Sequence, residues 1–212
     1  MRYIKRLPKP DILERKEKIW LEKFLASGNK RPNNKQYGHA EIIETLSVMS
    51  YSKCFYCESK LIENKQVDHY QEVNEDKTLA FNWENLFLTC KCNQKKLSNQ
   101  KIPNEATLNP CIDSDEEIAK HLTFHGEQIV GKTEKGDLTI QKYKLNREEL
   151  DSPRKTSIIK FFKQLIELQK NAMQEKRTKL SDKEINILRQ FASKEKPFSL
   201  MFKILLTEKG FL

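Results

Sequence analysis

The fold of this chain is decided by residues 54–96, which read CFYCESKLIENKQVDHYQEVNEDKTLAFNWENLFLTCKCNQKK. Two cysteine pairs enclose most of the segment, a C-x-x-C motif at Cys54 and Cys57 and a C-x-C motif at Cys90 and Cys92. Structural zinc takes four such ligands in a tetrahedron, and two turn-borne pairs supply them. The spacing predicts a zinc site, with a buried pair of reduced thiols as the alternative.

The rest of the segment indicates strands and a helix around these cysteines. Residues 67–70 read VDHY, and the apolar run LFL at residues 86–88 suits a buried strand that ends at the second cysteine pair. Residues 94–98 suit the start of a helix. The sequence therefore predicts two strands followed by a helix, pinned at one end by zinc.

The order of these motifs is C-x-x-C, then D-H, then N-L, then a cysteine pair followed by N-x-x-K, and it resembles the ββα-metal core of HNH endonucleases. The resemblance implies that His69 is the general base and that Asp68 and Asn93 hold one divalent cation, Mg²⁺ or Mn²⁺. It also implies that Asn85 braces the loop that aims the histidine. Asn93 replaces the family's last histidine, as in its HNN variants.

The implied roles agree with the chemistry of phosphodiester hydrolysis. A neutral imidazole titrates in the range needed to take a proton from water. A hard cation with carboxylate and amide oxygen ligands stabilises the leaving oxygen. Each motif alone is weak evidence for a nuclease, since an Asp-His pair usually lies in a solvated turn. The ordered set of four elements in one short segment favours a nuclease site.

Two features depart from the family's pattern. The family often has H-x-R-P, whereas His69 is followed by YQEV at residues 70–73, and the second cysteine pair is shortened by one residue. Contacts to phosphate are therefore expected from other cations. The nearest candidates for nucleic-acid binding are Lys91, Lys95, Lys96 and Lys101.

The overall charge agrees with a polyanionic partner. The chain has 212 residues and a formal net charge of +9 at pH 7, and a basic surface attracts nucleic acid. We expect DNA rather than RNA. The first residues lack the apolar run of a secretory signal, and no stretch reaches the length that spans a membrane. We therefore expect a cytoplasmic protein with reduced thiols and no membrane contact.

The chain as a whole predicts an α+β fold, a zinc-stapled ββα-metal core embedded in a mainly helical chain. We expect an N-terminal helical segment over residues 1–52, the HNH nuclease core over 53–100, and a strand-turn extension over 101–150. Residues 151–212 are expected to form C-terminal helices with a partner-binding surface, because apolar residues gather near Phe161 and Phe202.

Local signals place the other elements. Asp11 and Glu14 have capping-box spacing at the start of a helix that Gly28 ends, and a loop and then a helix over residues 40–49 follow. Acidic residues at 113–117 favour a short helix start. Strands are expected around residues 121–124, 128–130 and 137–143. Further helices are expected after Ser152, after Ser181, and over residues 198–205.

A wider resemblance covers segments outside the core. Residues 1–10 (MRYIKRLPKP), 107–124 (TLNPCIDSDEEIAKHLTF) and 136–150 (GDLTIQKYKLNREEL) are similar to HNH endonucleases of retron and Septu antiphage systems, the PtuB-like family. Members usually act with a partner ATPase of the ABC or SMC-like type. The resemblance implies a nuclease effector that this ATPase holds inactive and that phage infection releases.

Three functions stay open at this point: a DNA-cleaving effector, an RNA nuclease (for tRNA, for example) with the same site, and a zinc-stapled nucleic-acid-binding module without activity. The joint presence of Asp68, His69, Asn85 and Asn93 favours a nuclease, because a binding fold needs only the cysteines.

Overall fold

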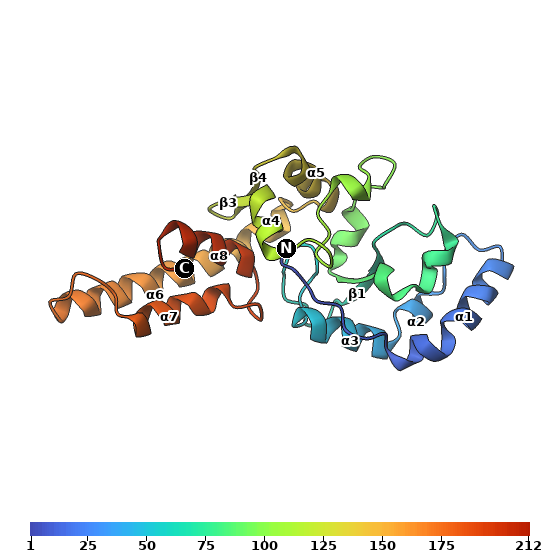
Figure 1. Ribbon diagram of the computed structural model, residues 1–212, viewed down its shortest axis with the longest axis horizontal. Helices are drawn as coiled ribbons and strands as arrows, with labels where there is room; N and C mark the ends of the chain where they lie inside the picture. Colours follow the sequence, from blue (N-terminus) through green and yellow to red (C-terminus); the bar gives the residue numbers. More distant parts are fainter.

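The computed structural model describes residues 1–212, apart from the side chain of Asn93. The molecule is elongated (Figure 1): the N-terminal helices and the first strand pair lie at one end, and three C-terminal helices extend as an arm at the other. Small antiparallel sheets and helices are mixed along the chain, which confirms the α+β prediction. Among the described residues, no helix combines the length and the apolar character needed to cross a membrane.

The N-terminal segment contains α1 (Asp11–Ala26), α2 (Asn34–Tyr37) and α3 (Ala40–Ser50). The predicted capping box of α1 is wrong, because Pro10 holds the cap position and Asp11 is already helical. The Asp11 carboxylate instead interacts favourably with the positive N-terminal end of the helix dipole. The short α2 lies in the predicted loop. The helix predicted over residues 40–49 is confirmed as α3, which the His39 ring caps by accepting from Glu41 N–H.

The first sheet pairs β1 (Gln66–His69) with β2 (Leu86–Thr89) in antiparallel fashion. The connection between them holds two 3₁₀ helices, η1 (Lys77–Phe81) and η2 (Trp83–Asn85). All four residues of β2 are buried, and α3 packs against this strand while α1 packs against η1. The two cysteine-bearing turns, residues 54–59 and 90–92, are named the knuckle. Burying one whole strand between helices and the knuckle fixes its register, since a slip of one residue would reverse every side chain.

The helix predicted to begin over residues 94–98 is wrong. A 3₁₀ helix, η3 (Lys91–Lys95), begins between the two cysteines of the second pair and contains Cys92, and the chain after it is irregular. Leu97 N–H donates to the Lys142 carbonyl at 2.9 Å instead of to a carbonyl four residues earlier, so the chain is drawn away from a helical path. Another 3₁₀ turn, η4 (Asn104–Ala106), follows.

The second sheet packs against α4 (Asp115–His121), α5 (Glu134–Tyr143) and the C-terminal helix α8 (Ser199–Glu208). It pairs β3 (Leu122–His125) with β4 (Gln128–Gly131), as predicted, and α4 precedes it. The strand predicted over residues 137–143 is wrong, because this segment belongs to α5. The Thr133 side chain accepts from Gly136 N–H as a cap, and acidic residues in the first turn suit the helix dipole.

The C-terminal arm contains η5 (Glu148–Leu150), α6 (Asp151–Gln174), α7 (Asp182–Arg189), η6 (Gln190–Ala192) and α8 (Ser199–Glu208). The predicted Ser181–Glu184 capping box is confirmed. Phe161, Phe191 and Phe202 pack together, with ring centroids 5.2–5.6 Å apart. Because Phe161 is 0% and Phe202 2% exposed, these residues form the core of the arm, and the partner-binding surface predicted for residues 151–212 stays a prediction.

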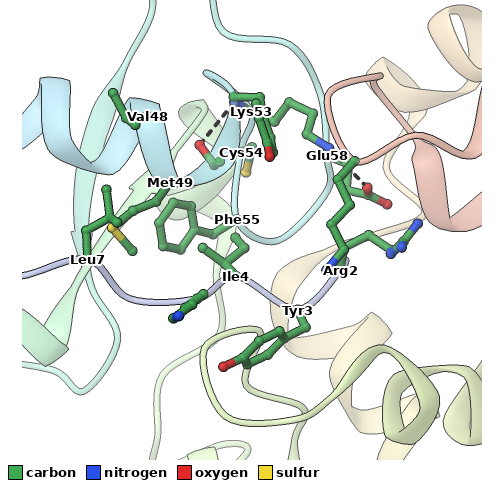
Figure 2. Close-up of a pocket in the computed structure, with 14 residues that line it drawn as sticks. Arg2, Tyr3, Ile4, Leu7, Val48, Met49, Lys53, Cys54, Phe55 and Glu58 are labelled. Carbon is green, nitrogen blue, oxygen red and sulfur yellow. Dashed lines mark hydrogen bonds and ion pairs between the residues drawn. The ribbon is translucent and has the colours of Figure 1, made fainter.

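The arm is joined to the cysteine-bearing segment through Glu58, which Figure 2 shows close to Lys53. Its carboxylate accepts from the Met1 ammonium at 3.2 Å and from Ser199 Oγ at 2.6 Å, and Lys53 lies beside it at 3.5 Å. Burial alone would raise the pKa of Glu58, but the Met1 and Lys53 cations lower it to about 2. The charged carboxylate therefore ties the first residue, the knuckle and α8 together.

Candidate functional site

The four knuckle cysteines form one cluster. Their sulfur atoms all lie within 4.8 Å of one another; the Cys54–Cys92 and Cys57–Cys90 distances are 3.6 and 3.8 Å. A zinc–sulfur tetrahedron with bonds of about 2.3 Å has edges of about 3.8 Å. The donor set and its spacing therefore fit one zinc-sized ion, and the shortened C-x-C pair reaches the cluster as well as the C-x-x-C pair does.

A tight turn brings the first cysteine pair into position. Glu58 N–H donates to the Cys54 carbonyl, and Cys54 N–H donates to Ser59, while Glu58 has a left-handed φ of 59°. Phe55 N–H donates to the Leu88 carbonyl at 2.9 Å, which fastens the turn to β2. Since β2 runs directly into the second cysteine pair, this one bond aligns the two pairs.

A cation from outside the segment contacts the cluster. One guanidinium nitrogen of Arg147, Nη2, lies 3.3 Å from both Cys57 Sγ and Cys90 Sγ. Four thiolates around a divalent ion carry a net charge of −2, so a donor shared by two sulfurs lowers the cost of burying them. Sequence reasoning missed Arg147, because a single arginine 55 residues after Cys92 carries no motif.

Asp68 is held from two sides on β1. Tyr56 Oη, within the first cysteine pair, donates to Asp68 Oδ2 at 2.9 Å, and Lys96 Nζ donates to the same oxygen at 2.7 Å. The Lys96 ammonium also donates to the His69 carbonyl at 2.7 Å. Lys96 is only 7% exposed and is therefore an internal partner of the Asp68 carboxylate. Contact of Lys96 with phosphate would require that ion pair to be exchanged.

His69 ends β1 with its ring fixed in orientation. Its Nε2 lies 2.8 Å from the Ala80 carbonyl oxygen, and its ring meets the Tyr37 ring edge-on at a centroid distance of 4.7 Å. A carbonyl only accepts, so Nε2 carries the proton and Nδ1 keeps its lone pair. Burial lowers the pKa of His69 below its ordinary value, although the Ala80 carbonyl and Asp68 oppose this shift. The ring is therefore neutral near pH 7 and able to accept a proton.

Asn85 ties together the loop that supplies Ala80. Its Oδ1 accepts from Gln71 N–H at 2.7 Å, and its Nδ2 donates to the carbonyls of Gln71 and Leu79 at 3.0 and 3.2 Å. The side chain is 6% exposed, so all these bonds are shielded from water. Asn85 thus holds both ends of the connection between β1 and η1, next to the carbonyl that orients His69.

Asp68 and His69 line one open cleft of about 360 Å³. Its walls also include Arg31, Tyr37, Glu72, Gln94 and Lys96. Arg31 is exposed and gives the cleft a cation that sequence reasoning did not single out, although it lies in the basic segment NKRPNNK at residues 29–35. The larger hollow of about 480 Å³ in Figure 2 lies elsewhere, and its lining includes neither Asp68 nor His69.

Two curated proteins that are similar to this chain carry the same name. No protein-family model matches this chain. A Septu protein PtuB of Bacillus thuringiensis is 31% identical over 179 residues, which cover 81% of this chain and 66% of that protein. A Septu protein PtuB of Bacillus mycoides is 28% identical over 153 residues, or 56% of this chain and 51% of that protein. The chain is therefore similar to proteins named Septu protein PtuB. The chain spans between half and just under two thirds of these PtuB relatives.

The remaining predicted residues of this PtuB-like chain are placed as follows. Lys91 and Lys101 are exposed, and exposed Lys95 pairs with Glu149. Their contact with nucleic acid stays a prediction, as do the catalytic roles of Asp68, His69 and Asn85. The side chain of Asn93, the other predicted cation ligand, lies outside the described residues.

Proposed function

We propose that this chain is a metal-dependent HNH endonuclease that hydrolyses phosphodiester bonds of DNA. The observation that supports this most strongly is the 2.8 Å contact between His69 Nε2 and the Ala80 carbonyl. It leaves Nδ1 of a buried, neutral imidazole as the proton acceptor, beside the Asp68 carboxylate and in a cleft with a cationic wall. A binding module would need neither the fixed tautomer nor the adjacent carboxylate.

The proposed reaction uses His69 as the general base. Nδ1 takes a proton from a water molecule as the water oxygen forms a bond to phosphorus, and the bond from phosphorus to the leaving oxygen breaks. Asn85 keeps Ala80 in place, so the ring cannot turn away during proton transfer. Arg31, at the wall of the cleft, offers a phosphate contact that does not require an ion pair to be broken.

Asp68 and Asn93 would hold the divalent cation, Mg²⁺ or Mn²⁺. When bound, the cation supplies a positive charge that stabilises the leaving oxygen. A carboxylate and an amide oxygen are the donor types that such hard cations prefer. The Lys96 ammonium shares the Asp68 carboxylate, and so it balances the buried charge whenever the cation is absent.

The four clustered cysteines would hold a structural Zn²⁺ ion. All four ligand positions are then filled by sulfur, which leaves no open position for substrate or water. The ion would join the turn at Cys54 to the end of β2 and thereby fix the strand pair that carries Asp68 and His69. Its role in this proposal is to hold the fold and not to take part in the reaction.

The cellular role that we propose is antiphage defence. Its support is the similarity to proteins named Septu protein PtuB. In this proposal the nuclease works in a complex with an ATPase of the ABC or SMC-like type, which holds it inactive until infection.

The proposal is tested with purified protein, alone and co-expressed with an ABC-type or SMC-like ATPase from the same host. Supercoiled plasmid and total cellular RNA are incubated with Mg²⁺, Mn²⁺ or EDTA, and the products are separated on gels. Cleavage of plasmid that EDTA abolishes is the expected result. Cleavage of RNA but not of plasmid would show that the substrate of this site is RNA. Binding of either polymer without metal-dependent cleavage, with and without the ATPase, would overturn the nuclease proposal.

A further inference from the structure

The C-terminal arm carries an exposed apolar stripe along α6. Ile159, Ile166 and Met173 are 46%, 50% and 75% exposed, and each follows the last by seven residues. A seven-residue spacing places side chains on nearly the same side of a helix, two turns apart. The stripe extends over roughly 21 Å at about 1.5 Å per residue. A helix of a soluble protein normally turns such a row inward.

A hollow between α6, α8 and β3 continues this stripe sideways. Its volume is about 150 Å³, and its apolar lining consists of Phe124, Ile158, Phe162, Met201, Ile204 and Leu205. Phe162 lies between Ile159 and Ile166 in the sequence, three and four residues from them, so it neighbours both on the helix surface. The stripe and the hollow therefore form one apolar surface, which we name the arm groove.

Lysines border the arm groove. Lys155 and Lys163 lie four residues before and after Ile159, Lys170 lies four residues after Ile166, and all three are exposed. Lys209 Nζ lies 5.3 Å from the centroid of the Phe162 ring. Two acidic residues interrupt the lysines: Glu208, which lines the hollow, and the exposed Glu167, which lies between Lys163 and Lys170 on α6. The long methylene stems of the lysines extend the apolar surface while their ammonium groups form a positive rim.

We propose that the arm groove binds an amphipathic helix of a partner protein whose apolar face is bordered by Asp or Glu. Helix-in-groove recognition uses apolar anchors at spacings such as i and i+7, as the stripe provides. The positive rim selects acidic flanks. A second copy of this chain fits poorly, because pairing two stripes would bring Lys163 and Lys170 of each copy against the same lysines of the other.

The arm groove is separate from the candidate nuclease site, since it lies on α6 and α8 while Asp68 and His69 lie on β1 (Figure 1). The proposal therefore does not depend on catalysis by His69. A catalytically inactive chain should bind its partner through the groove, and failure of this binding would leave the nuclease proposal unaffected.

The test uses photo-crosslinking of the full chain in its native host. The variant Ile166→p-benzoylphenylalanine is compared with Ile62→p-benzoylphenylalanine, because Ile62 is 83% exposed but lies outside the arm. Cross-linked peptides are identified by mass spectrometry. We expect position 166, and not position 62, to attach to a segment of another protein with a helical apolar period and acidic flanks. Attachment to this chain, to a basic segment, or at no more than the level of position 62 would overturn the proposal.

Charge reversal provides the second measurement. In the position 166 variant, Lys163→Glu with Lys170→Glu is expected to lower the cross-link yield by about tenfold, and Lys→Arg at the same two positions should preserve it. Thermal unfolding checks that the folds are unchanged, which is expected because both lysines are exposed. Equal yields for the Glu and Arg variants would show that the rim does not select an acidic partner.

Discussion

The phenol of Tyr56 donates a hydrogen bond of 2.9 Å to the carboxylate of Asp68. Tyr56 lies between the two cysteines of the first pair, so the metal knuckle directly positions the residue that we propose as a cation ligand. The Tyr56 ring is 1% exposed and stacks on Tyr143 at a centroid distance of 4.2 Å. Burial raises the pKa of Tyr56 well above its ordinary value, so the hydroxyl keeps its proton and donates.

Tyr56→Phe should weaken the candidate site more than the fold. The variant keeps the stacked ring but loses one donor to a buried carboxylate, and we expect stability to fall by roughly 1–2 kcal/mol. We expect cleavage to fall more than in Tyr143→Phe. That matched variant also removes a buried hydroxyl, one that contacts Thr107 and not Asp68. Stability is measured by urea unfolding and cleavage by initial rates. Equal losses of cleavage in the two variants would contradict a positioning role.

His69→Ala should remove most cleavage and leave the protein folded. General-base catalysis contributes about 10²–10⁴-fold, and a loss in that range is expected in single-turnover plasmid cleavage. The control is His125→Ala, because His125 is exposed at the end of β3. The circular dichroism spectrum should match that of the native chain. Cleavage by His69→Ala at the rate of His125→Ala would rule out His69 as the base.

The pH dependence of cleavage should report the buried imidazole. Only neutral His69 accepts a proton, so activity is present above the pKa of the folded protein and is lost as pH falls through it. Burial lowers this pKa, and the acid midpoint is therefore expected below the ordinary value of about 6.5. Rates are measured from pH 5 to 8 at saturating Mg²⁺. A midpoint above that ordinary value would mean that another group, or a charged partner of His69, controls the rate.

Lys96→Met should make the protein more dependent on a divalent cation. Without the ammonium at 2.7 Å, the Asp68 carboxylate is left as a poorly compensated buried charge. We expect the variant to be less stable than the native chain in EDTA, and to gain more in melting temperature from added Mn²⁺. Lys95→Met is the control, because Lys95 is exposed and pairs with Glu149. An equal response of both variants to Mn²⁺ would show that ammonium and cation do not compete for Asp68.

Arg147→Met should loosen metal bound by the cysteine cluster. The lost guanidinium contacts two sulfurs at 3.3 Å, and outer contacts of this kind change metal affinity by about 10–100-fold. Release of Zn²⁺ to a chromogenic chelator should be faster in this variant, and Arg147→Lys should recover part of the difference. Arg177→Met serves as the control, since Arg177 pairs with Glu184 on the arm. Release of Zn²⁺ at the same rate as in Arg177→Met would show that Arg147 does not stabilise the bound metal.

Local signals in the sequence were sufficient where a short motif of fixed spacing carries the information. The C-x-x-C and C-x-C spacings predicted the cysteine cluster, and the capping box of Ser181 and Glu184 predicted the start of α7. The error over residues 137–143 was also local, because Thr133 as a cap and Glu134 and Asp137 in the first turn favour a helix. Alternation of Leu138 and Ile140 with polar residues concealed that signal.

The rest of the candidate site depends on contacts that no local pattern encodes. His69 is oriented by a backbone carbonyl, that of Ala80, and every residue type provides a carbonyl. Tyr37 meets the His69 ring from α2, and Arg147 reaches the cysteines from the turn before η5. Such partners follow from how helices pack around β2, which is a property of the whole chain.

The pairing of Cys57 with Cys90 has a consequence for how the chain folds. These two sulfurs lie 3.8 Å apart although 33 positions separate the residues, and the segment between them contains Asp68, His69 and Asn85. Closing a loop of that length costs roughly 3 kcal/mol of chain entropy, and it is a slow, non-local step. An ion that binds both cysteine pairs before the segment between them folds would offset this entropy cost early in folding. The supply of metal during synthesis would then set the folding rate of this segment.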